Sequence, residues 1–575
     1  MTKSIFAPEA GLNGSNFEPY AEAITARLAA WEEAQVGRRI WAHDPTVWIA
    51  DPEQAAHTAE LTDRLGWLTS GPEMLAQLDE LADFAAQVRA SGCREIVLLG
   101  MGGSSLAPEL YALTFPSSPG APTLTVLDTT DPAAIAAVAK RLDLSRTLFV
   151  VSSKSGGTIE TMSLFHFFWE QVAAEDPEPG RHFVAITDPG SSLEVLATER
   201  QFRAIFPGPA TVGGRYSALT YFGLVPAALI GVPCRYLLER AQEMGRRCGP
   251  EVAAAQSPGL VLGAILGELA LAGRDKVTFF LSPGVAAFGS WVEQLIAEST
   301  GKQGRGIVPV PEEMPARPAA YGEDRLFAYL RVEGDQNAAL DEAYAAVEEA
   351  GQPCLRIDFR DKYDLGAAFF RWELATAAAG AVLAINPFDQ PNVAAAKKKA
   401  GELIKQYEET GSLSAPAPRL EEGGLQLFGD VEPGLTRVEA ALDAFFALRK
   451  EGDYVALMAY LPPTPELHEA LSRIRWALRD QLHLATTLGW GPRFLHSTGQ
   501  LHKGDANRGL FVQITHDPAP ELPVPGQPYS FGVLITAQAQ GDFEALQENG
   551  RRVVRVHLKG DEIAGLAQLY DALPD

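Results

Sequence analysis

The sequence predicts an α/β protein with two doubly wound parallel-sheet domains followed by a C-terminal α/β region. Short apolar runs alternate with helical patterns in two successive series, as in a parallel sheet that carries helices on both faces. A third series follows a stretch rich in Ser, Pro, Glu and Gly. With 575 residues, the chain is also too long for one hydrophobic core.

These patterns divide the chain into a mainly helical N-terminal segment, a first and a second parallel-sheet domain, a linker and the C-terminal α/β region. Their bounds are residues 1–75, 76–240, 241–409, 410–424 and 425–575. The apolar runs of the first domain are Ile96–Leu99, Leu124–Leu127, Leu148–Val151 and Phe183–Ile186. Those of the second are Val277–Leu281, Ile307–Val310, Phe327–Val332 and Leu355–Phe359, closed by helices over Gly366–Leu383 and Val393–Tyr407. The C-terminal runs are Tyr454–Met458, Leu510–Ile514, Phe531–Ile535 and Val553–Val556.

Two of the strand-to-helix turns are rich in Ser and Gly. The first, GMGGSS, follows the run Ile96–Leu99, and the second, SSKSGGT, follows Leu148–Val151. Such turns gather backbone N–H groups and hydroxyls at a helix N-terminus, which carries partial positive charge and suits a phosphate monoester. The first loop lacks the third glycine of a dinucleotide fingerprint and the Gly-Lys-Ser/Thr of a P-loop. The loops therefore favour a small phosphorylated ligand over a nucleotide.

The composition of the chain limits which classes of partner it is expected to bind and in which cellular compartment it is expected to lie. The net charge of −25 argues against nucleic acid or an anionic membrane surface as a partner. The four cysteines are widely spaced and form no metal-ligand motif, as expected in a reducing compartment. The N-terminus lacks the pattern of a signal peptide, and the apolar stretch Tyr221–Pro233 is too short to span a membrane. We expect a cytoplasmic protein.

Five motifs occur in the order seen in phosphoglucose isomerases: GMGGSS, SSKSGGTIET, GGRYS (213–217), EQLIAESTGK (293–302) and NPFDQPNVAAAK (386–397). The chain resembles that family over about residues 80–410, which implies that both predicted sheet domains are sugar-isomerase domains. The tail, with GPRFLHSTGQLHKGD and FGVLITAQAQGDFEAL, is similar to the isomerase part of bifunctional transaldolase/phosphoglucose isomerases. The implied reaction interconverts glucose 6-phosphate and fructose 6-phosphate through an enediolate, without metal or cofactor.

The resemblance assigns roles to individual residues. An aldose–ketose isomerisation needs a base beside the carbonyl and a cation near the enediolate. Glu298 matches the family's base, and Arg215, which follows two glycines, supplies a guanidinium. Lys397, the first of three consecutive lysines, matches a catalytic lysine at the sugar ring oxygens. Gln294 lies one helical turn before Glu298 and matches a substrate contact. The remaining sugar and phosphate contacts are Gly103, Ser104, Ser153, Lys154, Ser155 and Thr158.

The ring-opening histidine is a departure from the family pattern. Family members carry it between the base and the lysine, but no histidine lies between Glu298 and Lys397. The nearest likeness is GQLHKG (499–504), so His502 is the predicted catalytic histidine and His496 the second candidate. Either choice requires the C-terminal region to fold back onto the site of its own or a neighbouring subunit.

Several alternatives stay open at this point. Isomerase domains also serve in sugar-phosphate sensors, and a related isomerase could also accept mannose 6-phosphate. The residues before the first Ser/Gly loop cannot supply the ~200 or more residues of a (β/α)₈ barrel, so transaldolase activity is not expected in this chain. A homodimer, as is common in the family, and a relation to a separate transaldolase module both remain open.

Overall fold

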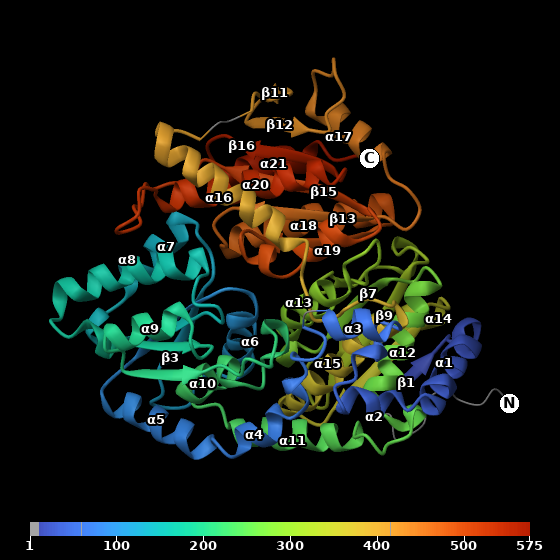
Figure 1. Cartoon of the computed structure of the whole chain (residues 1–575). Helices are drawn as coiled ribbons and strands as arrows, with labels where there is room; N and C mark the ends of the chain where they lie inside the picture. Colours follow the sequence, from blue (N-terminus) through green and yellow to red (C-terminus); the bar gives the residue numbers. More distant parts are fainter. Residues whose placement is uncertain (1–10, 59, 414–415, 575) are drawn as a thin grey trace.

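In the computed structural model, residues 11–58, 60–413 and 416–574 are described, and they build three sheets that lie in three lobes (Figure 1). The first two lobes form the lower part of the view and the C-terminal lobe lies across them. Two of the sheets have five strands and the C-terminal one has six. The predicted α/β class, with two doubly wound sheets and a C-terminal α/β region, is confirmed.

The first sheet has the order β3-β2-β4-β5-β6 and is parallel throughout. All six residues of β4 are buried, which explains why its sequence TLFVVS is apolar rather than alternating. Its strands are β2 (Glu95–Gly100), β3 (Thr123–Leu127), β4 (Thr147–Ser152), β5 (Phe183–Thr187) and β6 (Ala204–Pro207). Its helices are α5 (Leu78–Ala90), α6 (Leu106–Thr114), α7 (Pro132–Arg141), α8 (Ile159–Glu175), α9 (Ser192–Glu199) and α10 (Tyr221–Leu229).

The second sheet has the order β1-β10-β9-β7-β8, and only the edge strand β1, from the N-terminal segment, is antiparallel. Its strands are β1 (Asn13–Ser15), β7 (Lys276–Leu281), β8 (Val308–Val310), β9 (Arg325–Val332) and β10 (Cys354–Phe359). Its helices are α11 (Cys234–Arg247), α12 (Pro258–Leu271), α13 (Phe288–Thr300), α14 (Ala338–Glu349) and α15 (Leu365–Val382). The N-terminal segment adds α1 (Ala21–Glu33), α2 (Val36–Trp41), α3 (Pro52–His57) and α4 (Ser70–Leu75).

The C-terminal sheet has the order β11-β12-β16-β15-β13-β14, with β16, β15, β13 and β14 mutually parallel. Its strands are β11 (Leu420–Glu422), β12 (Leu425–Gly429), β13 (Tyr454–Tyr460), β14 (Ala485–Trp490), β15 (Gly509–His516) and β16 (Arg552–Leu558). Its helices are α16 (Val393–Thr410), α17 (Val438–Ala447), α18 (Pro465–Leu482), α19 (Gly499–Gly504), α20 (Phe531–Glu548) and α21 (Glu562–Asp571).

Three details differ from the sequence-based expectation. The apolar run Phe531–Ile535 is not a strand but the start of α20, where the Ser530 hydroxyl accepts a hydrogen bond from the Val533 N–H and caps the helix. The end of the expected linker pairs with β12 as strand β11. Helix α16, expected to close the second domain, packs along α20 so closely that a Cβ on Gly541 would lie 2.7 Å from the Ala400 nitrogen.

Helices α16 and α20 also join the C-terminal lobe to the first lobe. Leu403 and Ile404 of α16 and Phe531 of α20 belong to the same apolar cluster as Phe165 of α8. This shared core fixes the C-terminal lobe against the Ser/Gly-rich loops of the first sheet. Among the described helices, none is long and apolar enough to cross a membrane.

Candidate active site

The loop between β4 and α8 leaves the N-terminus of α8 without a side-chain cap. The Ser153 hydroxyl accepts a hydrogen bond from the Gly156 N–H at 3.1 Å and lies 3.1 Å from the Thr158 hydroxyl. Thr158 precedes α8, but its side chain does not cap the helix. The first-turn N–H groups of a helix lack partners within the helix, so this end can receive an anion. Ser153 and Thr158 therefore lie together, as expected.

Lys154 and Ser155 lie in the same loop but in different surroundings. The Lys154 ammonium donates to Asp188 at 2.6 Å and to the Pro209 carbonyl at 3.1 Å, so its charge is already paired. Burial lowers the pKa of Lys154, although Asp188 acts in the opposite direction. Ser155 is exposed, and its hydroxyl accepts from the Gly157 N–H at 3.3 Å. Substrate contact by Lys154 and Ser155 stays a prediction: the Lys154 ammonium is already paired, and the Ser155 side chain is exposed.

The glycines of the β2–α6 loop allow three chain segments to meet. A Cβ on Gly103 would lie 2.1 Å from the Gly214 carbonyl oxygen, beside Arg215. Gly102 has a φ of +55°, and a Cβ there would lie 2.8 Å from the His496 carbonyl oxygen. Ser104 is buried at the end of the short 3-10 turn that precedes α6. The loop brings the first sheet, the Arg215 turn and the C-terminal lobe together, and substrate contact by Gly103 and Ser104 stays a prediction.

Glu298 lies at the centre of the group of predicted residues. Its Oε1 lies 3.2 Å from Nη1 of Arg215, and its Oε2 accepts a hydrogen bond from the Gln294 amide at 3.0 Å. Gln294 and Glu298 are one turn apart on α13, the spacing expected from sequence. Both Gln294 and Glu298 are buried, and Glu298 keeps 9% of its surface exposed to solvent. A carboxylate thus faces a guanidinium.

The NPFDQ segment holds the Arg215 guanidinium in one orientation. Nη2 donates to the carbonyls of Pro387 and Asp389 at 2.8 and 3.0 Å. Nε donates to the Ser299 hydroxyl at 2.8 Å. Lys302 pairs with the Asp389 carboxylate at 2.7 Å, and burial followed by repulsion from Arg215 lowers the pKa of Lys302 to about 8. The NPFDQ motif therefore also orients Arg215, in addition to preceding Lys397.

Lys397 lies on the exposed side of α16. Its charge acts on Glu160, a buried carboxylate in the first turn of α8. Burial raises the pKa of Glu160, but His496 and then Lys397 act against it, and the net pKa lies below the usual value. Lys397 thus acts on Glu160 through its charge and is not held in an ion pair by the described residues; its contact with substrate stays a prediction.

The two candidate histidines occupy different environments. Nε2 of His496 lies 3.0 Å from Oε1 of Glu160, and the His496 carbonyl accepts from the Gln294 amide at 2.7 Å. The ring of His502 instead lies between Phe494 and Phe511, with centroid distances of 5.9 and 5.0 Å. Its Nδ1 is buried without a hydrogen-bond partner among the described residues. Burial, with added repulsion from nearby cations, holds the pKa of His502 well below its usual value.

The structure therefore joins His496 to this group, through its carbonyl to Gln294 and its imidazole to Glu160, whereas the His502 side chain forms no hydrogen bond to these residues. The match of GQLHKG to the family pattern drew the prediction to His502, but that segment is the short helix α19, whose residues are all buried. Sequence reasoning also missed Glu160, although it lies within the quoted motif SSKSGGTIET. A carboxylate in the first turn of a helix that opens on a phosphate loop was a usable signal, because the helix N-terminus stabilises negative charge.

The C-terminal lobe reaches this site within one chain. Gln538 of α20 donates to Glu160 at 2.7 Å and accepts from the Thr130 hydroxyl at 2.7 Å. Arg493 pairs with Asp128 and Glu109, each at 2.6 Å. The fold-back expected from sequence is thus present in cis. Within the described residues, no cluster of three or more His, Cys, Asp or Glu side chains is arranged to hold a metal ion.

Comparisons with known proteins agree on one family. A model of phosphoglucose isomerases matches residues 69–313. The chain is 29% identical over 377 residues to a glucose-6-phosphate isomerase of Rubrobacter xylanophilus, with 57% of this chain and 86% of that protein covered. A solved structure from Thermus thermophilus, described as a hypothetical protein, gives a TM-score of 0.58 at 26% identity over 70% of this chain and 100% of that one. A glucose-6-phosphate isomerase from Chlamydia trachomatis shares the fold, with a TM-score of 0.59 at 19% identity over 70% of this chain and 89% of that one.

Proposed function

We propose that the chain is a phosphoglucose isomerase, which interconverts glucose 6-phosphate and fructose 6-phosphate; the family model over residues 69–313 and the similarity to glucose-6-phosphate isomerases support this. The observation that carries the proposal is the Glu298 carboxylate, oriented by Gln294 and placed 3.2 Å from the Arg215 guanidinium. A carboxylate can move one proton between adjacent carbons, and a guanidinium can stabilise the enediolate oxygens that form between the two transfers.

In this mechanism Glu298 removes the proton from C2 of open-chain glucose 6-phosphate. The electrons of that C–H bond form the enediolate, whose negative oxygen faces Arg215. A proton also moves from the C2 hydroxyl to the C1 oxygen of the enediolate, and return of the carbon-bound proton from Glu298 to C1 then gives the C2 ketone and C1 hydroxyl of fructose 6-phosphate. Because the Arg215 guanidinium is held by carbonyls of the NPFDQ segment, it needs no reorientation when charge develops, which is where fixed hydrogen-bond donors contribute most.

Ring opening is assigned to His496 in place of His502. Opening the pyranose requires a proton on the ring oxygen and removal of one from the anomeric hydroxyl. His496 is paired with Glu160 at 3.0 Å, an arrangement in which the carboxylate orients the imidazole, and it adjoins the Gly102 loop. The role of Lys397 at the ring oxygens is proposed from the family resemblance, and its charge acts on Glu160 of this pair.

The substrate phosphate is assigned to the loop between β4 and α8. Ser153, Ser155 and Thr158 offer hydroxyls there, and the uncapped N-terminus of α8 offers backbone N–H groups. Lys154 is expected to contribute through its backbone, since its ammonium is paired with Asp188. This loop is far from Glu298 in the sequence, and residues of the C-terminal lobe connect the two. His496 contacts both Glu160, at the start of α8, and Gln294, beside Glu298, and Gln538 also donates to Glu160.

A coupled assay tests the activity directly. The chain is incubated with fructose 6-phosphate, and any glucose 6-phosphate formed is oxidised by an added dehydrogenase that reduces NADP⁺. The enzyme hypothesis predicts turnover that the Glu298→Gln variant lacks. Binding of fructose 6-phosphate without turnover would instead favour the sugar-phosphate sensor. A parallel reaction with mannose 6-phosphate decides whether the isomerase has the broader scope.

Homodimerisation, cytoplasmic location and a relation to a transaldolase module stay predictions. The cis position of His496 means that the residues assembled around Glu298 require no second subunit. Light scattering at assay concentrations measures the oligomeric state, and activity of a monomeric form would agree with a site completed by one chain.

A further inference from the structure

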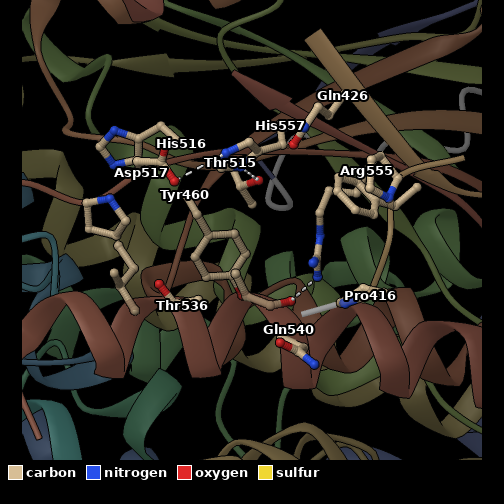
Figure 2. Close-up of a pocket in the computed structure, with 15 residues that line it drawn as sticks. Pro416, Gln426, Tyr460, Thr515, His516, Asp517, Thr536, Gln540, Arg555 and His557 are labelled. Carbon is tan, nitrogen blue, oxygen red and sulfur yellow. Dashed lines mark hydrogen bonds and ion pairs between the residues drawn. The ribbon is translucent and has the colours of Figure 1, made fainter. Parts of the chain in front are cut away.

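The C-terminal lobe contains a cavity of about 310 Å³ on one face of its sheet, between the strands and α20 (Figure 2). Its walls come from the carboxyl-terminal halves of parallel strands, from β12, from α20 and from the connection that enters β11. In parallel α/β sheets, ligands bind preferentially beyond the carboxyl ends of the strands. The lining includes Tyr460, Thr515, Thr536, Arg555, His557 and Gln426. None of these residues takes part in the site around Glu298.

Arg555 is the unusual member of this cavity, because it is a buried charge that forms no direct ion pair among the described residues. It is 8% exposed, and it forms no ion pair with any carboxylate in the described part of the chain. Nε donates to the Gln513 amide oxygen at 2.7 Å, and Nη2 donates to the Ala539 carbonyl at 3.1 Å. Nη1 has no hydrogen-bond partner among the described residues. Burial lowers the pKa of Arg555 to about 10, which reflects the cost of keeping this charge away from water.

The neighbouring acidic groups are engaged with other partners. Asp542 and Glu544 of α20 act on Arg555 through their charge, but Asp542 is paired with Lys503 and Glu544 accepts from the Gln540 amide at 3.0 Å. His557 is bound to Thr515 at 3.0 Å and lies 3.4 Å from Asp517, whose own side chain is 83% exposed at the rim. His516 is held between Asp131 and Glu562, at 3.2 and 2.9 Å, so those two carboxylates are already paired. Phe543 covers one face of the guanidinium, with its centroid 4.2 Å away, and leaves its hydrogen-bonding edge free.

We propose that this cavity binds a small hydroxylated organic carboxylate, whose carboxylate group pairs with Arg555. A carboxylate carries the single charge that one guanidinium balances, and it can accept from Nη1. A phosphate dianion would require further cations or a helix N-terminus, but the cavity meets α20 at Ile535–Gln540, beyond its first turn. Thr515, Thr536 and Gln426 offer partners for hydroxyl groups, while the ring of Tyr460 offers an apolar wall. The volume suits a ligand of about the size of a hexonic acid.

The test uses the full chain and gluconate as the probe, measured by isothermal titration calorimetry. Saturable binding is expected, with inorganic phosphate and glucose at least tenfold weaker than gluconate. Arg555→Met should weaken gluconate binding at least tenfold. Arg473→Met is the control for loss of one positive charge from the same lobe, since the Arg473 side chain is 65% exposed on α18. Glu298→Gln should bind gluconate as the parent does, which separates this cavity from the isomerase site.

A second variant guards against loss of folding in Arg555→Met. Thr536→Trp fills the cavity from the half-buried side of α20 without removing an Arg555 hydrogen bond, and it should also abolish binding. The proposal is overturned if gluconate fails to bind, or if folded Thr536→Trp binds it unchanged. Tighter binding of phosphate than of gluconate at this cavity would overturn the carboxylate assignment. If only the Glu298→Gln variant lost gluconate binding, gluconate would be binding at the isomerase site, and the proposal for this cavity would be overturned.

Discussion

Nε2 of His496 lies 3.0 Å from Oε1 of Glu160, although the two residues are 336 positions apart and belong to different lobes. The same carboxylate oxygen also accepts from Gln538, so two C-terminal groups converge on the first turn of α8. The contact is made by the docking of the C-terminal lobe on the first sheet. It places an imidazole beside the loop to which the substrate phosphate is assigned.

The first prediction separates the two histidines. His496→Ala should lower kcat on closed-ring substrate by about 10²–10⁴-fold, the usual contribution of a positioned acid or base. Exchange of the carbon-bound proton in substrate that has opened spontaneously should fall much less, because that step uses Glu298. His502→Ala should leave kcat within a few-fold and instead lower the thermal midpoint, since it removes a ring packed between Phe494 and Phe511. The reverse pattern would restore His502 as the ring-opening group.

The second prediction concerns the base. Glu298→Gln retains the size of the side chain but cannot accept a proton, so kcat should fall at least ~100-fold while fructose 6-phosphate still binds. Turnover is measured with the coupled assay and binding by calorimetry. A variant that keeps kcat within a few-fold of the parent would show that Glu298 is not the base. Glu293→Gln, on the same helix, is the control for nonspecific damage.

The third prediction concerns phosphate recognition by the loop between β4 and α8. Ser153→Ala and Thr158→Ala should each raise KM for fructose 6-phosphate more than they lower kcat, because the phosphate is remote from the reacting carbons. Each lost hydrogen bond to a charged group is expected to cost about 1.5–3 kcal/mol of binding. Inhibition by inorganic phosphate should weaken in parallel. If both variants retain the parent KM and phosphate inhibition, the phosphate lies elsewhere.

The fourth prediction concerns stability against pH. Glu373 on α15 is 1% exposed, and burial holds its pKa well above the usual value. Between the unfolded pKa and this raised folded pKa, the native state retains a proton that the unfolded state has lost. The free energy of unfolding should therefore fall as pH rises through this window, by about 1.4 kcal/mol for each pH unit.

Glu373→Gln removes this titration, so the variant should gain stability relative to the parent as pH increases from 5 to 8. Denaturation midpoints at several pH values measure the difference. Glu349→Gln at the exposed end of α14 is the control and should track the parent. A constant difference between Glu373→Gln and the parent at all pH values would mean that Glu373 ionises normally in the native state.

Local patterns predicted the sheets well, because a buried strand between two helices must be apolar along its whole length. The runs that became β2, β4 and β9 are of this kind. The same reasoning failed at Phe531–Ile535, where an apolar run begins a helix buried on several sides, and only the Ser530 cap distinguishes the two outcomes. The expected role of Glu298, with Gln294 one turn away, depended on local spacing and was therefore accessible.

Local sequence could not show which histidine lies at the site. His496 and His502 are only six positions apart, but long-range packing places His496 against Glu160 of the first lobe and His502 against Phe511 inside the C-terminal lobe. That contact is set by glycines far away in the chain, such as Gly102, whose missing side chain admits the His496 backbone. Long-range packing of this kind leaves no periodic trace in the sequence.

Helix α8, helix α13 and the segment before α19 each carry one part of the proposed chemistry, and each belongs to a different lobe. Turnover is therefore a readout of how the lobes are docked, whereas circular dichroism reports mainly on the helices and strands within each of them. In a denaturant titration, activity should disappear at a lower concentration than the far-ultraviolet signal. A preparation with full secondary structure but separated lobes would be inactive, and would regain activity by docking alone.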